Sequence, residues 1–133
     1  MTKDLYKVIC KELKQPDANY YGCFTTLKYK DNRLEELYNQ RKVRGFDDSE
    51  TWSLCSTIAK FTLPRLKRFK ELKFCHPCNI DEKTWDTYLD EMIYAFEYAV
   101  NKYDIDTEYS EEEFNRVLNG FKLFGEYFLD LWW

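Results

Sequence analysis

The chain of 133 residues contains few turn-forming residues and few residues with catalytic chemistry. Only 4 Gly and 3 Pro are present, which disfavours a β-sandwich because its many strands need frequent turns. His76 is the single histidine, so every Ser-His or Cys-His mechanism would have to depend on it. Phosphate-binding glycine loops and the H-E-x-x-H and G-x-S-x-G motifs do not occur. We therefore expect a protein that is not an enzyme.

Long apolar runs are also missing. No stretch reaches the roughly 18 uncharged apolar residues that a membrane span requires. Residues 1–14 are charged throughout and lack the apolar centre of a signal peptide. The cysteines number 5, which is odd, and without a secretory signal we expect reduced thiols. The sequence thus predicts a soluble cytoplasmic protein.

Charge is distributed unevenly along the chain, although the net charge is only −4. Residues 1–73 hold 16 of the 20 Lys and Arg against 10 Asp and Glu, whereas residues 74–133 hold 4 against 14. One interpretation is that basic and acidic helices pair with each other or are solvated separately. The alternative is a positive surface that meets an anionic partner. We favour the first interpretation.

Three helix starts have similar capping signals. Asp47 with Glu50, and Ser110 with Glu113, have the spacing of a capping box, and Asp81 is placed as an N-cap. Apolar residues then recur at i, i+3, i+4 and i+7 after each start. Such stripes are buried most simply against each other, so we predict an all-α fold with a bundle of three long amphipathic helices.

Particular residues within these helices carry further expectations. Pro64 removes one backbone hydrogen bond, so we predict a kink or a break near residues 60–63. Gly120 and Gly125 are expected to permit close approach of another helix. The predicted apolar stripe of the last helix contains Phe114, Val117, Leu118, Phe121, Phe124, Phe128, Leu131 and Trp132.

The length of the chain suits a single domain over residues 1–133. Within it, residues 1–45 form a less regular N-terminal part and residues 46–133 form the three-helix core. One or two shorter helices are expected in the N-terminal part.

The N-terminal part contains one segment that the sequence leaves open. Apolar spacing predicts a short amphipathic helix over residues 2–14. Residues 17–30 are either a loop packed by its tyrosines or a short hairpin, and we favour the loop. Asp31 is placed to cap a helix over residues 32–43, which Gly45 is placed to end.

The run CHPC at residues 75–78 has the C-x-x-C spacing of metal and redox sites. A structural zinc site needs four ligands, and Cys10, Cys23 and Cys55 are isolated from one another in the sequence. Thioredoxin-type chemistry needs a strand before the motif, which this sequence does not predict. Since Pro77 and Asn79 favour a turn, we interpret the run as a connection between helices and predict neither metal nor cofactor.

The segment KFTLPRLKRFKELK, residues 60–73, is strongly basic. Together with Arg41, Lys42 and Arg44 it has the chemistry to contact a phosphate-bearing ligand or a nucleic-acid backbone. The alternative, which we favour narrowly, is that these long side chains cover apolar surface and are compensated by the acidic second half. A sequence pI of about 5.1 argues against a nucleic-acid-binding module.

Aromatic residues add to the candidate contact surface. Trp133 does not fit the stripe of the last helix, so we expect it to dock onto the protein or to contact a second copy in a dimer. The residues that we predict to contact an anionic ligand or a partner are Arg44, Trp52, Lys60, Arg65, Arg68 and Trp133.

The runs RGFDDSETWSLCSTIAKFTLPRLKRFKEL, DEKTWDTYLDEMIYAFEYA and LFGEYFLDLWW resemble a family of small, uncharacterised bacteriophage-encoded helical proteins. The resemblance covers about residues 43–133. The chain departs from the family pattern at Cys55, where the family often has an acidic residue, and at residues 75–78, where it often has Gly-aromatic-Pro. The resemblance implies a phage origin and a location in the host cytoplasm, but no catalytic residue.

Two functions fit these observations. The first is a non-catalytic protein that binds a host or anti-phage defence protein and inhibits or redirects it. The second is a sponge that sequesters an anionic signalling nucleotide through Arg44, Lys60, Arg65 and Arg68. Neither interpretation requires a membrane or nucleic acid, and a homodimer is compatible with both.

Overall fold

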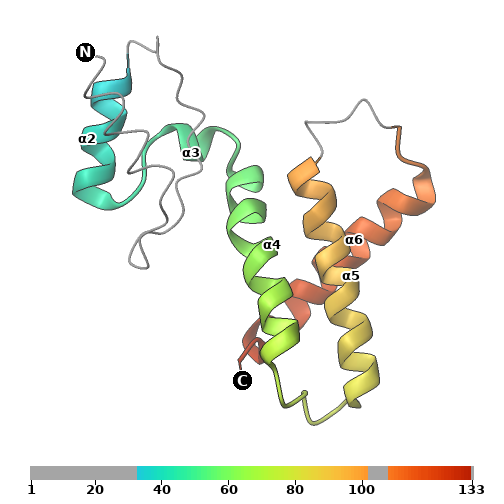
Figure 1. Ribbon diagram of the computed structural model, residues 1–133. Helices are drawn as coiled ribbons and strands as arrows, with labels where there is room; N and C mark the ends of the chain where they lie inside the picture. The colour runs from blue at the N-terminus through green and yellow to red at the C-terminus, as the bar shows by residue number, and fades with distance from the viewer. Residues whose placement is uncertain (1–32, 102–107, 133) are drawn as a thin grey trace. The chain divides into compact units, whose positions relative to one another are not determined.

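The computed structural model describes residues 33–101 and 108–132, and the secondary structure within these ranges is entirely helical. The elements, shown in Figure 1, are α2 (Leu34–Arg44), α3 (Ser49–Trp52), α4 (Leu54–Leu72), α5 (Glu82–Asn101), α6 (Glu111–Glu126) and the 3₁₀ helix η1 (Phe128–Asp130). The all-α prediction is confirmed for these residues. None of the described helices combines the length and the hydropathy needed to cross a membrane. The helix expected at 2–14 and the loop or hairpin at 17–30 lie outside the described residues.

The chain divides into two compact units, Met1–Thr57 and Ile58–Trp133. In the first unit, α2 ends where the sequence predicts. Gly45 adopts a left-handed conformation with φ of 83°, and its N–H donates a hydrogen bond of 2.8 Å to the carbonyl of Arg41. Glycine adopts this conformation at little cost, which makes it a common helix end. The expected cap of this helix, Asp31, lies outside the described residues.

The long helix predicted to follow Asp47 is interrupted, but not where we expected. Ser53, with φ of −118° and ψ of 68°, separates α3 from α4. The break that we considered at residues 60–63 does not occur, because α4 continues through Pro64 to Leu72; the alternative of a kink stays a prediction. Pro64 is exposed, and the guanidinium of Arg65 donates a hydrogen bond of 2.8 Å to the carbonyl of Phe61 in the same turn. Pro64 itself lacks the backbone N–H that would donate to the carbonyl of Lys60, four residues earlier.

Apolar side chains from three helices form the core of the second unit. The cluster consists of Ala59 and Leu66 from α4, Trp85, Leu89, Met92 and Phe96 from α5, and Leu123 and Tyr127 from α6 and the residue after it. Trp85 packs against Tyr127 with ring centroids 5.5 Å apart. Burial of large apolar side chains of this kind is the main favourable contribution to folding.

Helix α6 crosses α5 (Figure 1). The two helices approach each other closely at Gly120. A Cβ atom at this position would lie 2.3 Å from the carbonyl oxygen of Glu91 and 2.6 Å from the Cβ of Ala95. Only glycine therefore permits the backbones to approach so closely. The expectation of close approach is confirmed for Gly120 and wrong for Gly125, where a Cβ would meet nothing within 4 Å.

The buried face of α6 differs from the predicted apolar stripe. Val117, Gly120 and Leu123 are buried, whereas Phe114 and Leu118 of the stripe are 46% and 50% exposed. The close contact at Gly120 decides which side faces α5. After α6 the chain tightens into η1, which changes the angular spacing of side chains. Trp132 is consequently 67% exposed, so its predicted place in the core is wrong.

Two of the predicted helix caps are confirmed. The Ser110 side chain accepts a hydrogen bond of 3.2 Å from the N–H of Glu113, and the Glu113 carboxylate accepts one of 2.8 Å from the N–H of Ser110. The Asp81 carboxylate accepts a hydrogen bond of 2.6 Å from the N–H of Thr84. This bond stabilises the charged carboxylate and lowers the pKa of Asp81 below its usual value of 3.8.

Candidate functional site

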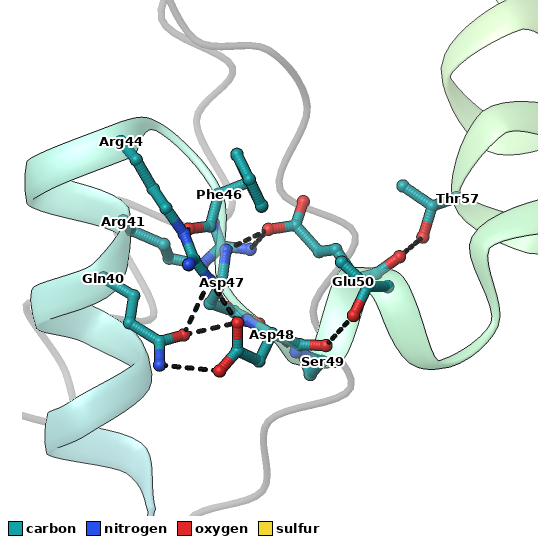
Figure 2. Close-up of polar contacts among 10 residues, drawn as sticks. Gln40, Arg41, Arg44, Phe46, Asp47, Asp48, Ser49, Glu50 and Thr57 are labelled. Atoms are coloured by element: carbon teal, nitrogen blue, oxygen red, sulfur yellow. Dashed lines mark hydrogen bonds and ion pairs between the residues drawn. The ribbon is translucent and has the colours of Figure 1, made fainter.

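A buried group of charges lies in the first unit, between α2 and α3 (Figure 2). Arg41 contacts two carboxylates, with its Nε 2.5 Å from Asp47 Oδ2 and its Nη2 2.9 Å from Glu50 Oε2. All three side chains are at least nine-tenths buried. Arg41, which the sequence groups with the candidate anion-binding residues, therefore serves an internal role. The pattern alone did not reveal this, although the capping spacing of Asp47 and Glu50 marks the turn.

Asp47 and Glu50 also organise the backbone before α3. The N–H of Ser49 donates a hydrogen bond of 2.8 Å to Asp47 Oδ1, and the N–H of Asp47 donates one of 2.7 Å to Glu50 Oε2. The capping box predicted at Asp47 is wrong in its N-cap, because the N-cap of α3 is Asp48, which forms no side-chain cap hydrogen bond. The hydrogen bond from the N–H of Asp47 to the Glu50 carboxylate is the part of the predicted pattern that forms. The carbonyl of Glu50 accepts a hydrogen bond of 2.7 Å from the hydroxyl of Thr57.

Arg44 and Trp52, two of the predicted contact residues, also lie in the first unit. The guanidinium of Arg44 lies 4.4 Å from the ring centroid of Phe46 and forms an ion pair with Asp48 (Figure 2). Hydrogen bonds from Arg44 and Gln40 lower the pKa of Asp48. Trp52 is 80% exposed and contributes no core packing. A large aromatic ring exposed to this extent is typical of a contact surface.

In the second unit, three of the four lysines of the basic segment pair with acidic residues of the neighbouring helix. Three ion pairs with N–O distances of 2.6–2.8 Å join α4 and the residue that follows it to α5: Lys67 with Glu97, Lys70 with Asp90, and Lys73 with Asp86. As the residue numbers of the lysines increase, those of their acidic partners decrease. The two helices are therefore antiparallel, as Figure 1 shows. For these lysines, compensation by the acidic half of the chain accounts for the basic charge.

The arginines of the same segment have different neighbours. The guanidinium of Arg65 lies 3.8 Å from the ring centroid of Phe61. Arg68 forms an ion pair of 2.7 Å with Glu71 on the same helix, and both side chains are more than 60% exposed. An exposed pair of this kind contributes little stability. Arg65 and Arg68 therefore remain accessible to a partner, whereas the paired lysines of α4 belong to the scaffold.

Both arginines line an apolar groove of about 450 Å³ in the second unit. Its walls come from α4, α6 and the segment that follows α6. The lining residues are Phe61, Thr62, Arg65, Leu66, Arg68, Phe69, Leu72, Phe124, Phe128 and Leu131. The sequence analysis proposed Arg65 and Arg68 as contacts but missed the groove, because its second wall lies more than fifty residues away along the chain.

The remaining predicted contacts are not assembled at this groove. Lys60 is exposed on α4 but does not line the groove. Arg44 and Trp52 belong to the other compact unit. Trp133 lies outside the described residues, so the prediction for it stays open. The structure thus brings together two of the predicted contact residues, Arg65 and Arg68.

The CHPC run lies in the connection between α4 and α5, as predicted. Cys75 and Cys78 are free thiols, and the Cys75 thiol lies 3.8 Å from the carbonyl oxygen of Trp132. The turn is closed by a hydrogen bond of 3.2 Å from the N–H of Ile80 to the carbonyl of Pro77. Within residues 33–101 and 108–132, no three His, Cys, Asp or Glu side chains are grouped as ligands of a metal ion.

No protein family model matches the chain, and neither curated proteins nor solved structures match it. The resemblance to small bacteriophage proteins therefore remains a prediction. The chemistry of the groove is the remaining guide to function. Its apolar lining provides binding surface, and its two guanidinium groups provide positive charge and hydrogen-bond donors.

Proposed function

We propose that this protein is a non-catalytic binding protein whose groove between α4 and the end of α6 holds part of another protein. The observation that carries the proposal is the different pairing of the basic residues of the segment 60–73: Lys67, Lys70 and Lys73 pair with α5, whereas Arg65 and Arg68 line an apolar groove. Apolar and aromatic surface beside arginine is typical of protein-binding sites. The three long helices would act as a bundle that holds the two walls of the groove in place.

The predicted phage origin makes a host or anti-phage defence protein the expected target. Binding without chemistry would inhibit such a target or redirect it in the host cytoplasm. The exposed ring of Trp52 would be a separate contact residue in the first unit. This assignment of the target depends on the resemblance, whereas the binding role depends on the groove.

A nucleotide sponge is the second candidate, favoured by the guanidinium groups and the aromatic rings of the same groove. A nucleotide would place its phosphates at Arg65 and Arg68 and stack its base on a ring such as Phe128. The lining offers few neutral hydrogen-bonding groups, with Thr62 the one hydroxyl. Because specific ligand sites normally fix a base through several such groups, we place this function second.

One purification separates the two functions. We expect the tagged protein to retain a specific protein from host lysate, and the variant Arg65→Ala/Arg68→Ala to lose it. A matched variant, Lys83→Ala/Lys122→Ala, removes two exposed positive charges of the second unit that lie outside the groove, and it should retain the partner. Mass spectrometry identifies the retained protein. Excess absorbance at 260 nm that is released by heat and lost in the arginine variant would instead establish the sponge.

A further inference from the structure

The α4 wall of the groove has the spacing of a helical ridge. Phe61, Arg65, Arg68 and Leu72 follow each other at intervals of four, three and four residues on α4. The other wall is formed by Phe124 of α6, Phe128 of η1 and Leu131 after η1. Because a helix rises about 1.5 Å per residue, the α4 wall is about 16 Å long, or about three turns. An apolar groove beside a helical ridge of this length has room for a helix of similar length, packed by its side-chain ridges.

The groove also has a defined charge. Its lining includes two guanidinium groups and no carboxylate. Within the described residues, the one ion pair formed by these arginines is the exposed pair of Arg68 with Glu71. A carboxylate from a partner could replace Glu71 at small cost, since exposed pairs of this kind contribute little. Acidic residues on the partner are therefore complementary to this edge.

The chain's own N-terminal segment does not supply that negative charge. Residues 2–14 carry Lys3, Lys7, Lys11 and Lys14 against two acidic residues, so the segment is net positive. If it forms the amphipathic helix that the sequence predicts, its charge opposes that of the arginines. The charge of the groove thus favours an occupant from another molecule.

We infer that the groove binds an acidic amphipathic helix of about three turns, contributed by a different protein. Apolar residues at i, i+4 and i+7 of that helix would fill the groove, as in other helix-in-groove complexes. Flanking Asp or Glu side chains would contact Arg65 and Arg68. This inference rests on the proposed function and specifies the chemistry of the partner.

The probe for the test is a fluorescein-labelled peptide of about 15 residues with Leu or Phe at i, i+4 and i+7, Glu beside this stripe and Ala elsewhere. Its matched control replaces every Glu with Lys. Fluorescence anisotropy is measured with the full-length protein, with Arg65→Glu/Arg68→Glu, and with Lys83→Glu/Lys122→Glu, which makes the same change in net charge. Circular dichroism confirms that each variant is folded.

We expect the acidic peptide to bind the unchanged protein and the lysine variant equally, and the arginine variant roughly tenfold or more weakly. The basic peptide should show the reverse preference and bind the arginine variant best. This exchange of specificity cannot arise from a folding defect. Phe128→Ala should weaken the binding of both peptides, because it removes apolar surface from the groove.

Three results would overturn the inference. The first is equal binding of the two peptides, and the second is binding that the arginine substitutions do not change. The third is a dimer, detected by sedimentation, that the arginine variant converts into a monomer, since a second copy would then occupy the groove. If host protein is captured through the groove but no acidic peptide binds, the inference fails while the proposed function stands. If neither binds, both fail.

Discussion

In the first unit the buried residues include a cation and two carboxylates, whereas the buried core cluster of the second unit is made of uncharged side chains. Arg41, Asp47 and Glu50 form the buried group of Met1–Thr57, and apolar residues around Trp85 form the core of Ile58–Trp133. Buried ion pairs fix geometry but contribute little net stability, because desolvation offsets their attraction. Apolar cores stabilise through the volume they fill. The two units should therefore respond to different kinds of substitution.

The largest effect is expected from removing the buried cation. The substitution Arg41→Met takes away the group that both Asp47 and Glu50 contact, and we expect it to lower the free energy of unfolding by about 3 to 5 kcal/mol. Adding Asp47→Asn and Glu50→Gln keeps the hydrogen-bond acceptors of the turn but removes both negative charges. The triple variant should regain more than half of the loss in urea denaturation followed by circular dichroism.

If the triple variant is as unstable as Arg41→Met alone, the side-chain packing of Arg41, rather than its charge, stabilises the first unit. Amide hydrogen exchange shows which helices lose stability. We expect the amides of α2 and α3 to lose protection in Arg41→Met and to regain it in the triple variant.

A smaller loss of stability is expected at the crossing of α5 and α6, where the cause is added volume rather than an unpaired charge. Gly120→Ala places a Cβ against the carbonyl oxygen of Glu91, so the helices must move apart, at a cost of about 2 kcal/mol. Gly125→Ala is the matched control on the same helix, where a Cβ meets nothing within 4 Å. Because alanine favours a helix, this control should be neutral or more stable by up to about 1 kcal/mol. Thermal unfolding of both variants checks the difference.

A second substitution tests whether volume is the cause. Ala95→Gly removes the Cβ that would lie 2.6 Å from the new methyl group, but it leaves the backbone of Glu91 in place. The double variant Gly120→Ala/Ala95→Gly should therefore not regain all of the stability that Gly120→Ala loses. Equal stability of Gly120→Ala and Gly125→Ala would contradict the close approach of the two helices.

The same contrast explains which features could be predicted from the sequence. Gly45, Asp81 and Ser110 mark helix ends correctly because capping depends on residues within a few positions of one another. The face that α6 buries was only partly predicted, since Phe114 and Leu118 continue the apolar pattern but remain exposed. The contact that selects the face involves the backbone of another helix, which no local pattern records.

The candidate site, too, could be predicted only as far as local sequence determines it. Arg65 and Arg68 could be proposed from their charge and spacing, but the wall opposite them depends on where the segment after α6 packs. Arg41 has the same side chain as these arginines, yet its partners place it inside the protein. Residue type therefore predicted the chemistry available, and tertiary contacts determined which guanidinium groups remain accessible.

The smallest effect concerns the start of α5, where a charge acts at the surface of the second unit. Since the pKa of Asp81 is lowered by the hydrogen bond from Thr84, the folded protein binds this proton less tightly than the unfolded chain. The resulting stabilisation is present above pH 3.8 and is lost as the pH falls through the lower pKa of the folded state. NMR titration of the Asp81 carboxyl carbon should give a midpoint below 3.8, the ordinary value. Asp81→Asn keeps a capping oxygen but cannot ionise, so its stability relative to the unchanged protein should improve towards acidic pH. A constant difference across this range would show that charge at Asp81 does not stabilise the helix.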